Sequence, residues 1–478
     1  MLEASTMTTT HLLRWGDVYK EAELYKAAIR VYTKPVFQWR KALFSSTDGR
    51  NLYDFAERGL ARLDGIHAAL LRRNFEFRPA VALHYNFNGK HRTLYVPPWE
   101  ERIVDLLLYR ALNRKLHNWF SPNSYAYRDR RYSLDACQRR IAGVLRATRT
   151  PLYIVKRDIA DYFASVNHGL LLNKLASLVD PADYLYRLLV QRVRFLYGED
   201  GRLQMATVGI PFGASIACLF ANIYLTELDR EIESATELQY FRYSDDLLML
   251  SASREAADQA AQRLEFQLNK LGLRTKASHR ADLLLAEKTT SDRTYSTVRN
   301  FRHLGLLFRN RGEVALSRDK LRKIQNLFRF AFRRNRRWKR ERDLRRRVQV
   351  LVSLAAEVIE KGVRNAAILD YYLKHVNDER QLRLLDRWLA EAVLSAALGG
   401  HKKGHFRKIS FRELRAMGLP SLVHRRRMIL SGRIESPFFV WRRAKAARGF
   451  RGTVAKLCRS AGQTAFPSFP EAAAGKRL

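Results

Sequence analysis

Three aspartates stand where short apolar runs end. Asp245 and Asp246 are adjacent between two such runs, and Asp158 closely follows a third, residues 152–155. Neighbouring like charges repel, and a tight hairpin prefers Asn-Gly or Asp-Gly, so an Asp-Asp pair is unusual as a purely structural turn. A divalent cation can hold such carboxylates together, and Mg²⁺ prefers hard oxygen ligands of this kind.

A carboxylate at the end of one strand can meet a pair of carboxylates from a second strand across a sheet. Three acids in this arrangement make the ligand set of a two-metal phosphoryl-transfer site, whose cations lie about 3.5–4 Å apart. We therefore predict two Mg²⁺ ions, with Mn²⁺ as a substitute, at Asp158, Asp245 and Asp246. The plainer alternatives are a solvated turn for the Asp-Asp pair and a helix cap for Asp158.

The elements that must position these acids follow from the apolar periodicity. Asn88–Gly89 between two alternating runs predicts a hairpin of residues 80–85 and 92–96. Residues 300–308 also resemble a strand. Apolar residues at three- and four-residue spacing predict helices in residues 19–73, 100–116, 134–147, 214–232 and 256–271. This order predicts an α+β domain whose antiparallel sheet has helices on one face.

Several short blocks occur in the order of the palm motifs of reverse transcriptases. They are residues 158–163, 209–214, 243–246, 271–276 and 301–306. Upstream, residues 90–97 with 101–104, and then 124–128, resemble the first two fingers blocks of prokaryotic members. Over residues 75–308 the chain therefore resembles prokaryotic reverse transcriptases related to group II intron enzymes. The resemblance implies an RNA-directed DNA polymerase with a right-hand fold of fingers, palm and α-helical thumb.

The resemblance, together with a loss of strand patterns after residue 316, predicts a division of the chain into five parts. These are an N-terminal helical extension (1–74), fingers (75–150), a palm (151–316) with a fingers insertion at about 170–208, a basic helical thumb (317–400), and a C-terminal helical extension and tail (401–478).

The resemblance also assigns roles near the acids. It implies that Asp158, Asp245 and Asp246 are the catalytic metal ligands, with the main-chain carbonyl of Ile159 as an addition. Phe163, five residues after Asp158, matches the steric gate that blocks a ribose 2′-hydroxyl and so favours deoxynucleotides. A core aromatic is the alternative role for Phe163.

Basic residues match positions that bind the incoming nucleotide. Lys90, Arg92 and Arg128 match fingers positions that grip the triphosphate, where cations neutralise charge that develops during transfer. Lys276 matches a lysine near the nucleotide that could donate a proton to pyrophosphate. A solvated surface charge is the alternative for each of them.

Phe212 departs from the family pattern. The palm loop of the family usually has the pattern Gly-x-Pro-Gln-Gly, and Phe212 stands here at the glutamine position. We expect this change to alter fidelity, sugar contacts or template use. Phe212 either stacks on a base or nucleotide sugar, or fills a hydrophobic gap in a relaxed loop.

The charge balance indicates a polyanionic partner. Lysine and arginine number 87 against 47 acids, a formal net charge of +40. Such an excess usually marks a nucleic-acid partner, with a membrane surface second. The densest run is expected on the thumb as a nucleic-acid contact: Arg333, Arg334, Arg336, Arg337, Trp338, Lys339 and Arg340. At helical spacing, the neighbouring Phe328 and Phe332 are expected in the core.

The cysteines and the apolar pattern limit the class of protein. Three widely spaced cysteines argue against a disulfide framework, a structural zinc site and a Cys-rich endonuclease domain. The sequence has no apolar run of 18 residues and no secretory pattern at residues 1–10, so we expect a bacterial cytoplasmic protein without a membrane partner.

The layout most resembles the unknown-group or defence-associated reverse transcriptases. This resemblance implies an RNA template, in particular a structured non-coding RNA, together with dNTPs, a DNA primer or product, and a role in antiviral defence. A partner protein or a homo-oligomer stays open. The alternatives are a group II intron-like or retron-like enzyme without a defence role, a protein-primed or weakly templated DNA polymerase, and an inactive RNA-binding scaffold.

Overall fold

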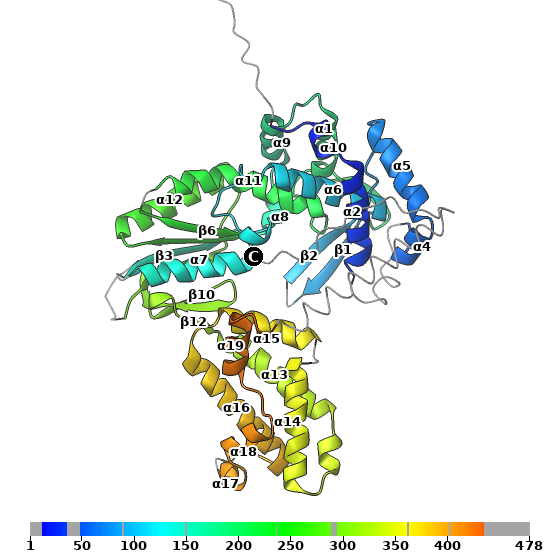
Figure 1. Cartoon of the computed structure of the whole chain (residues 1–478). Coiled ribbons are helices and arrows are strands. Elements are labelled where there is room, and N and C mark those ends of the chain that lie inside the picture. Colours follow the sequence, from blue (N-terminus) through cyan, green and yellow to red (C-terminus); the bar gives the residue numbers. More distant parts are fainter. Residues whose placement is uncertain are drawn as a thin grey trace, which may run out of the picture.

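The computed structural model describes most of the chain. The described residues are 12–35, 48–87, 90–148, 151–235, 237–287, 294–360, 363–400, 402 and 404–434, with the backbone alone at 87, 90, 130 and 363–368. The predicted turn Asn88–Gly89 and most of the predicted C-terminal tail lie outside these ranges. A mixed helical and sheet body carries an elongated body of helices on one side (Figure 1).

The first part of the chain is helical, as the apolar spacing predicts. It contains α1 (Trp15–Val18), α2 (Glu21–Thr33), α4 (Leu52–Glu57) and α5 (Gly59–Leu71). The longer α6 (Trp99–Lys115) packs against α2 and against α11 (Ser215–Glu233). Buried Ile103, Leu107 and Leu108 supply the inward stripe of α6.

A four-stranded sheet has the order β2-β1-β4-β5. The predicted hairpin is confirmed, because β1 (Ala80–Phe87) and β2 (Lys90–Val96) pair antiparallel. After α9 (His168–Leu178) and α10 (Tyr184–Val193), the chain returns to this sheet through β4 (Leu196–Glu199) and β5 (Arg202–Met205). These two strands were not predicted. Through the pairing of β4 with β1, they join the predicted fingers insertion (about 170–208) to the β1–β2 hairpin.

The central sheet has the order β6-β7-β3-β8-β9. The sequence predicts three adjacent strands of it, namely β3 (Leu152–Asp158), β7 (Asp246–Ser251) and the edge strand β6 (Gln239–Tyr243). It does not predict β8 (Ala281–Leu285) or β9 (Ser296–Val298), which are short and lack alternation.

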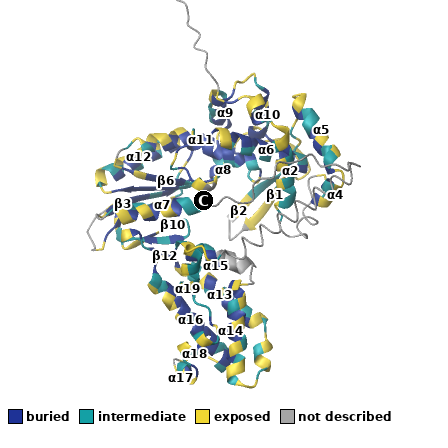
Figure 2. Ribbon diagram, viewed as in Figure 1, coloured by how far each residue is buried: buried dark blue, intermediate teal, exposed yellow. Residues whose placement is uncertain are grey.

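Both faces of the central sheet are covered. Val155, Leu247 and Met249 face one apolar core with α11 and α12 (Arg254–Lys270), while Ile154 and Leu248 face a second core shared with α7 (Leu134–Ala147). Dark-blue buried residues lie on both sides of the sheet in Figure 2. The predicted α+β class is confirmed, but the prediction of helices on one face only is wrong.

A small third sheet lies between the central sheet and the C-terminal helices. It consists of β10 (Asn300–His303), β11 (Leu306–Arg309) and β12 (Val314–Leu316). The single strand predicted at 300–308 is wrong, because Leu304 (φ +46°) and Gly305 (φ +82°) turn the chain back on itself. Alternating apolar residues continue through this tight turn, so periodicity alone does not reveal it.

Helices alone follow β12 within the described residues. α13 (Arg318–Arg334), α14 (Leu344–Glu360), α15 (Val363–His375) and α16 (Glu379–Leu398) form the elongated body, with the short α17 (His405–Lys408), α18 (Phe411–Ala416) and α19 (Leu422–Leu430) packed on it (Figure 1). The predicted burial of Phe328 and Phe332 is confirmed. Over the described ranges, none of the helices has both the length and the apolar character needed to cross a bilayer.

Candidate active site

The three aspartates meet at one end of the central sheet. In the antiparallel pairing of β3 with β7, Asp158 lies directly opposite Asp246. Asp245 lies in the two-residue turn between β6 and β7, where Tyr243 pairs with Asp246. Residues directly opposite in an antiparallel pair extend their side chains to the same face, so Asp158 and Asp246 share a face.

The turn that carries Asp245 is strained and held from several sides. Ser244 has φ +61°, a left-handed conformation that a non-glycine residue rarely adopts. Its Oγ lies 3.0 Å from the hydroxyl of Tyr127. The amide of Ile159 donates to the carbonyl oxygen of Asp245 at 3.1 Å, which ties the end of β3 to the turn. These bonds hold a conformation that the backbone alone disfavours.

A buried ion pair fixes β6 to α11 directly beneath the turn. The guanidinium of Arg242 donates to both carboxylate oxygens of Asp229, at 2.7 and 2.6 Å, and to Ser124 Oγ at 2.8 Å. Both charged side chains are inaccessible to solvent. Removing one member of such a pair costs about 3–5 kcal/mol. The pair was not predicted from the sequence. The only local signal for it is an arginine in the middle of an otherwise largely apolar strand.

The surroundings of Asp245 disfavour its charged form. Burial, followed by the negative charge of Asp158, raises the pKa of Asp245, and the positive charge of Lys276 acts in the opposite sense. The amide of Lys276 donates to the carbonyl oxygen of Asp158 at 2.8 Å, so the backbone of this lysine is anchored beside the acids. Its predicted role near the nucleotide stays a prediction.

A row of aromatic rings leads away from the acids. The ring centroids of Tyr127 and Phe163 are 6.1 Å apart, and those of Phe163 and Phe212 are 5.5 Å apart, with edge-to-face geometry in both pairs. The guanidinium carbon of Arg92 lies 5.8 Å from the ring centroid of Phe212. The structure therefore brings together Phe163, Phe212 and Arg92, which were predicted separately.

Residues 86–306 match the sequence model of a family described as reverse transcriptase (RNA-dependent DNA polymerase). The matched segment contains the three aspartates, the aromatic row and Arg92. Residues 86–306 therefore resemble a reverse transcriptase domain.

Two curated relatives are similar to parts of the chain at low identity. Protein YkfC of Escherichia coli (strain K12) is 25% identical over 193 residues, which are 38% of this chain and 48% of that protein. The "Uncharacterized 91 kDa protein in cob intron" of Schizosaccharomyces pombe is 24% identical over 212 residues, which are 41% of this chain and 25% of that protein. The chain thus spans about half, or less, of the length of these relatives.

Solved structures give a more distant likeness. A structure of apo telomerase from Candida tropicalis has a TM-score of 0.42 and 12% identity, and the match covers 81% of this chain and 66% of that chain. A structure of the telomerase in complex with a fragment of telomeric RNA has a TM-score of 0.42 and 10% identity, over 72% of this chain and 65% of that chain. These scores are low, and the family match does not depend on them.

The donor chemistry of the three aspartates fits divalent cations. Asp158, Asp245 and Asp246 offer hard carboxylate oxygens at one sheet end, and their mutual repulsion is the kind that a cation relieves. Within the described ranges, however, no three acidic, histidine or cysteine side chains converge closely enough to form a metal-binding group. The three ligands and the carbonyl of Ile159 stay predictions, and the carboxylates must reorient to close around an ion.

The structure describes the side chain of Arg128 but not that of Lys90, two of the residues predicted to bind the triphosphate. Lys90 begins β2, but its side chain lies outside the described part of the structure. The guanidinium of Arg128 donates to the carbonyl oxygens of Ser121, Ser124 and His117 and lies 3.6 Å from the ring centroid of Tyr132. These contacts indicate that Arg128 holds the loop together, and its predicted contact with a triphosphate stays untested.

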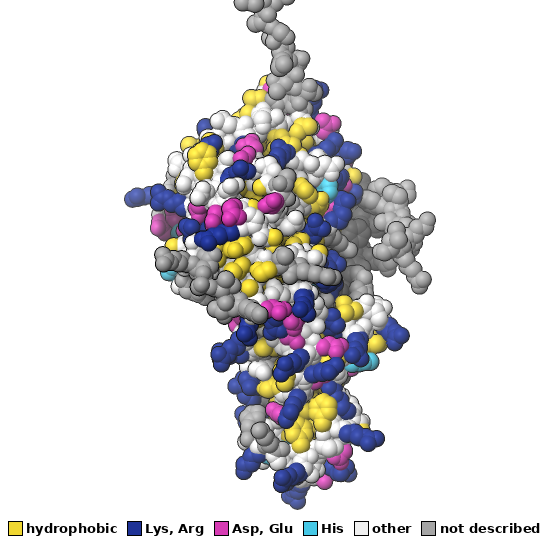
Figure 3. All heavy atoms as spheres, turned by 90° about the vertical axis from the view of Figure 1, so that its left-hand side faces the viewer, with side chains coloured by type: hydrophobic (Ala, Val, Ile, Leu, Met, Phe, Trp, Pro, Cys, Tyr) yellow, Lys and Arg dark blue, Asp and Glu magenta, His cyan; other side chains and the backbone are white. Residues whose placement is uncertain are grey.

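The predicted nucleic-acid contacts lie at the far end of α13. Arg333, Arg334, Arg336, Arg337, Lys339 and Arg340 are exposed. Lysine and arginine side chains are spread over the face of the C-terminal helices seen in Figure 3. Trp338 is half-buried, and its indole N–H donates to the carbonyl oxygen of Phe332 at 3.0 Å, which ties the ring to the end of α13. The arginines and lysines are therefore the residues best placed for a phosphate backbone.

Replacing Asp245 with Asn should stabilise the metal-free protein. The substitution removes one of the crowded charges, and each kcal/mol relieved raises the melting temperature by about 2–4 °C in domains of 150–250 residues. In EDTA we expect Asp245→Asn to melt above the wild type. Mg²⁺ should raise the melting temperature of the wild type by mass action, and that of the variant less.

Thermal melts with and without Mg²⁺ check this prediction. The exposed Asp180, which accepts a bond from the amide of Ala182, provides the control Asp180→Asn, for which neither effect is expected. An Asp245→Asn protein that melts no higher than the wild type in EDTA, and gains as much from Mg²⁺, would contradict the account of the site.

Proposed function

We propose that the protein is an RNA-directed DNA polymerase that transfers dNTPs by two-metal nucleotidyl transfer. The observation that carries the proposal is the register of β3 and β7, which places Asp158 opposite Asp246 and beside the Asp245 turn. This arrangement lies inside the segment that matches the reverse transcriptase family. An inactive scaffold would have no need to keep three repelling acids at a strained turn.

Asp158, Asp245 and Asp246 would hold the two Mg²⁺ ions, with the carbonyl of Ile159 as an additional ligand and Mn²⁺ as a substitute. When bound, the ions lower the pKa of the primer 3′-hydroxyl and stabilise the triphosphate. Lys276, whose backbone is anchored to Asp158, would give a proton to the departing pyrophosphate.

Residues of the first sheet and of the Phe163 segment complete the nucleotide site. Arg92 is exposed on β2 and provides positive charge for the triphosphate next to the aromatic row. Lys90 begins the same strand. Phe163 follows β3 in the chain, and its side chain is half-buried. In this role its ring would exclude a ribose 2′-hydroxyl.

The template is proposed to be RNA, in particular a structured non-coding RNA, with a DNA primer or product. The formal charge of +40 and the exposed arginines after α13 support this partner, because cations that neutralise phosphates supply most of the non-specific affinity. We propose bacterial antiviral defence as the setting and the cytoplasm as the location, on the resemblance of the layout to defence-associated enzymes. The alternative setting is an intron-related enzyme, which the relative named for the cob intron supports.

Polymerisation should depend on each acid of the site. With a primed RNA template, dNTPs and Mg²⁺, we expect Asp158→Asn and Asp245→Asn to lower kcat by at least about 10²-fold, the usual loss when one transition-state-stabilising group is removed. Asp180→Asn should polymerise as the wild type does. Primer extension by purified protein measures this effect.

Priming must be separated from catalysis in this assay. RNA primers, DNA primers and no primer are compared in parallel, because priming by a protein side chain is one of the alternatives. A wild-type protein that extends nothing under any of these conditions, with Mg²⁺ or Mn²⁺, would overturn the proposed activity. Equal extension by wild type and Asp245→Asn would overturn the proposed site.

The basic end of α13 should determine the salt dependence of RNA binding. Replacing Arg333, Arg334 and Arg337 with Gln removes three exposed cations, so the slope of log affinity against log salt should become shallower by about 2–3. A matched loss of three charges on α12, by Gln at Arg254, Arg263 and Lys270, should leave the slope nearly unchanged. Fluorescence anisotropy with labelled RNA at several salt concentrations measures both slopes. Equal slopes for the two triple variants would remove α13 from the binding surface.

A further inference from the structure

The loop of residues 209–214 is bonded to two separate parts of the segment that matches the reverse transcriptase family. On one side, the amide of Ile210 donates to the carbonyl oxygen of Phe163 at 2.8 Å. On the other side, the amide of Tyr95 on β2 donates to the carbonyl oxygen of Phe212 at 2.9 Å. The loop therefore links the segment that carries Phe163 to the β1–β2 hairpin that carries Arg92.

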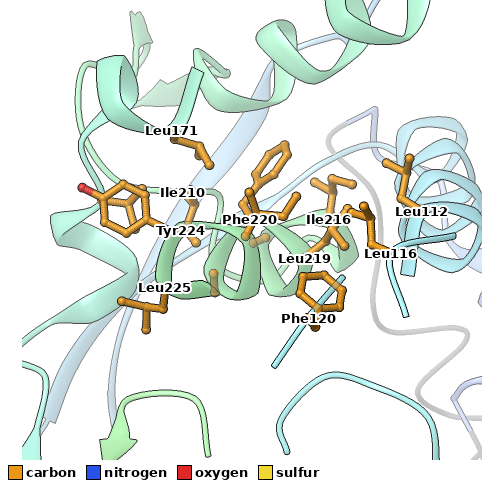
Figure 4. Close-up of a cluster of buried hydrophobic side chains, with 14 of the residues drawn as sticks. Leu112, Leu116, Phe120, Leu171, Ile210, Ile216, Leu219, Phe220, Tyr224 and Leu225 are labelled. Atoms are coloured by element: carbon orange, nitrogen blue, oxygen red, sulfur yellow. The ribbon is translucent and has the colours of Figure 1, made fainter. Parts of the chain in front are cut away.

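Close packing leaves this loop little freedom. A Cβ on Gly209 (φ +82°) would lie 3.1 Å from the backbone of Phe163 and Ala164, and a Cβ on Gly213 (φ +112°) would lie 2.4 Å from Leu94 Cδ1. Both positions thus require glycine, for conformation and for space. Between them, Ile210 is buried in the apolar cluster against α11 (Figure 4). The backbone on both sides of Phe212 is consequently fixed.

The side chain of Phe212 does not serve the core. Ile210 and Ala214 belong to the apolar core cluster, and Phe163 packs against it, whereas Phe212 belongs to neither core cluster of the described residues. Its aromatic contact is the edge-to-face pair with Phe163, at 5.5 Å between centroids, and the guanidinium carbon of Arg92 lies 5.8 Å from its ring centroid. A ring used as hydrophobic filling would be expected inside a cluster.

Phe163 in turn is connected to the acids. Its ring contacts that of Tyr127 at 6.1 Å between centroids, and the Tyr127 hydroxyl lies 3.0 Å from Ser244 Oγ in the turn next to Asp245. Besides the adjacent Tyr162, at 5.8 Å between centroids, Phe163 is therefore held by two aromatic neighbours from distant parts of the chain, one anchored to the catalytic turn and one anchored to β2. A ring that selects a sugar by excluded volume must be held in this way, because a ring that can retreat excludes nothing.

We propose that Phe212 is a positioning residue for sugar selection, which holds Phe163 where it excludes a ribose 2′-hydroxyl. Because the backbone of Phe212 is bonded to β2, the position of the Phe163 ring would then depend on the β1–β2 hairpin that carries Arg92. The inference rests on the proposed polymerase function. It gives the phenylalanine at the usual glutamine position a purpose in the choice between dNTPs and rNTPs.

The experiment compares incorporation of a dNTP and the matching rNTP by the full-length protein on one primed template. Phe212→Leu keeps an apolar side chain without a ring, Phe212→Tyr keeps the ring, and Phe163→Ala removes the gate itself. An edge-to-face aromatic contact corresponds to about two- to tenfold in an equilibrium or rate ratio. We expect Phe212→Leu to lower the dNTP/rNTP ratio of kcat/KM by this factor, mainly through faster rNTP use, and Phe212→Tyr to retain the wild-type ratio.

A double variant separates positioning from a direct contact. If Phe212 acts through Phe163, then Phe212→Leu should change the ratio little in a Phe163→Ala background, since coupled residues are not additive. Phe212→Gln provides a second ring-free variant if Phe212→Leu does not fold, as judged by its melting curve.

The outcomes distinguish this inference from the proposed function. A lowered ratio in Phe163→Ala, with unchanged ratios in Phe212→Leu and Phe212→Gln, would overturn the role of Phe212 and leave the polymerase intact. A full additive effect of Phe212→Leu in the Phe163→Ala background would also overturn it. Absence of any incorporation by the wild type would instead reject the proposed function, and the inference with it.

Discussion

The antiparallel register between β3 and β7 is the constraint on which the site depends. It places Asp158 opposite Asp246, and a slip of one residue would turn one of these side chains to the other face of the sheet. The apolar residues of β3 alternate between two buried cores, so a slip of one residue would also move each of them into the other core and disturb the packing of both. The packing of the whole sheet therefore specifies the position of the acids, and the Arg242–Asp229 pair anchors the neighbouring strand to α11.

The site stores unfavourable energy that the surrounding fold must offset. Ser244 and Asp161 both adopt left-handed φ angles, +61° and +41°, close to the carboxylates. Burial and the charge of Asp158 raise the pKa of Asp245, which shows that its charged form is disfavoured. Structures keep such strain where ligand binding relieves it, and divalent cations would relieve both the repulsion and the burial of charge.

The acids could be predicted from the sequence because local signals surround them. Short apolar runs flank the acids, and each acid stands where such a run ends. The same holds for most helices and for the β1–β2 hairpin. The Arg242 network, β8 and β9 could not be predicted, since they depend on partners far apart in the chain. Arg128 matched a family position, yet its guanidinium is engaged by three carbonyl oxygens that no local pattern reveals. The contact of Phe212 with Phe163 likewise required the fold.

The central claim is that Asp158, Asp245 and Asp246 bind metal ions as one site. Anomalous diffraction from crystals of the protein grown with Mn²⁺, a dNTP and a primed template tests it most directly. The account predicts two peaks about 3.5–4 Å apart, both within coordination distance of carboxylate oxygens from these aspartates. Nucleotide bound beside the aspartates without a metal peak there, or Mn²⁺ held by other residues, would contradict it.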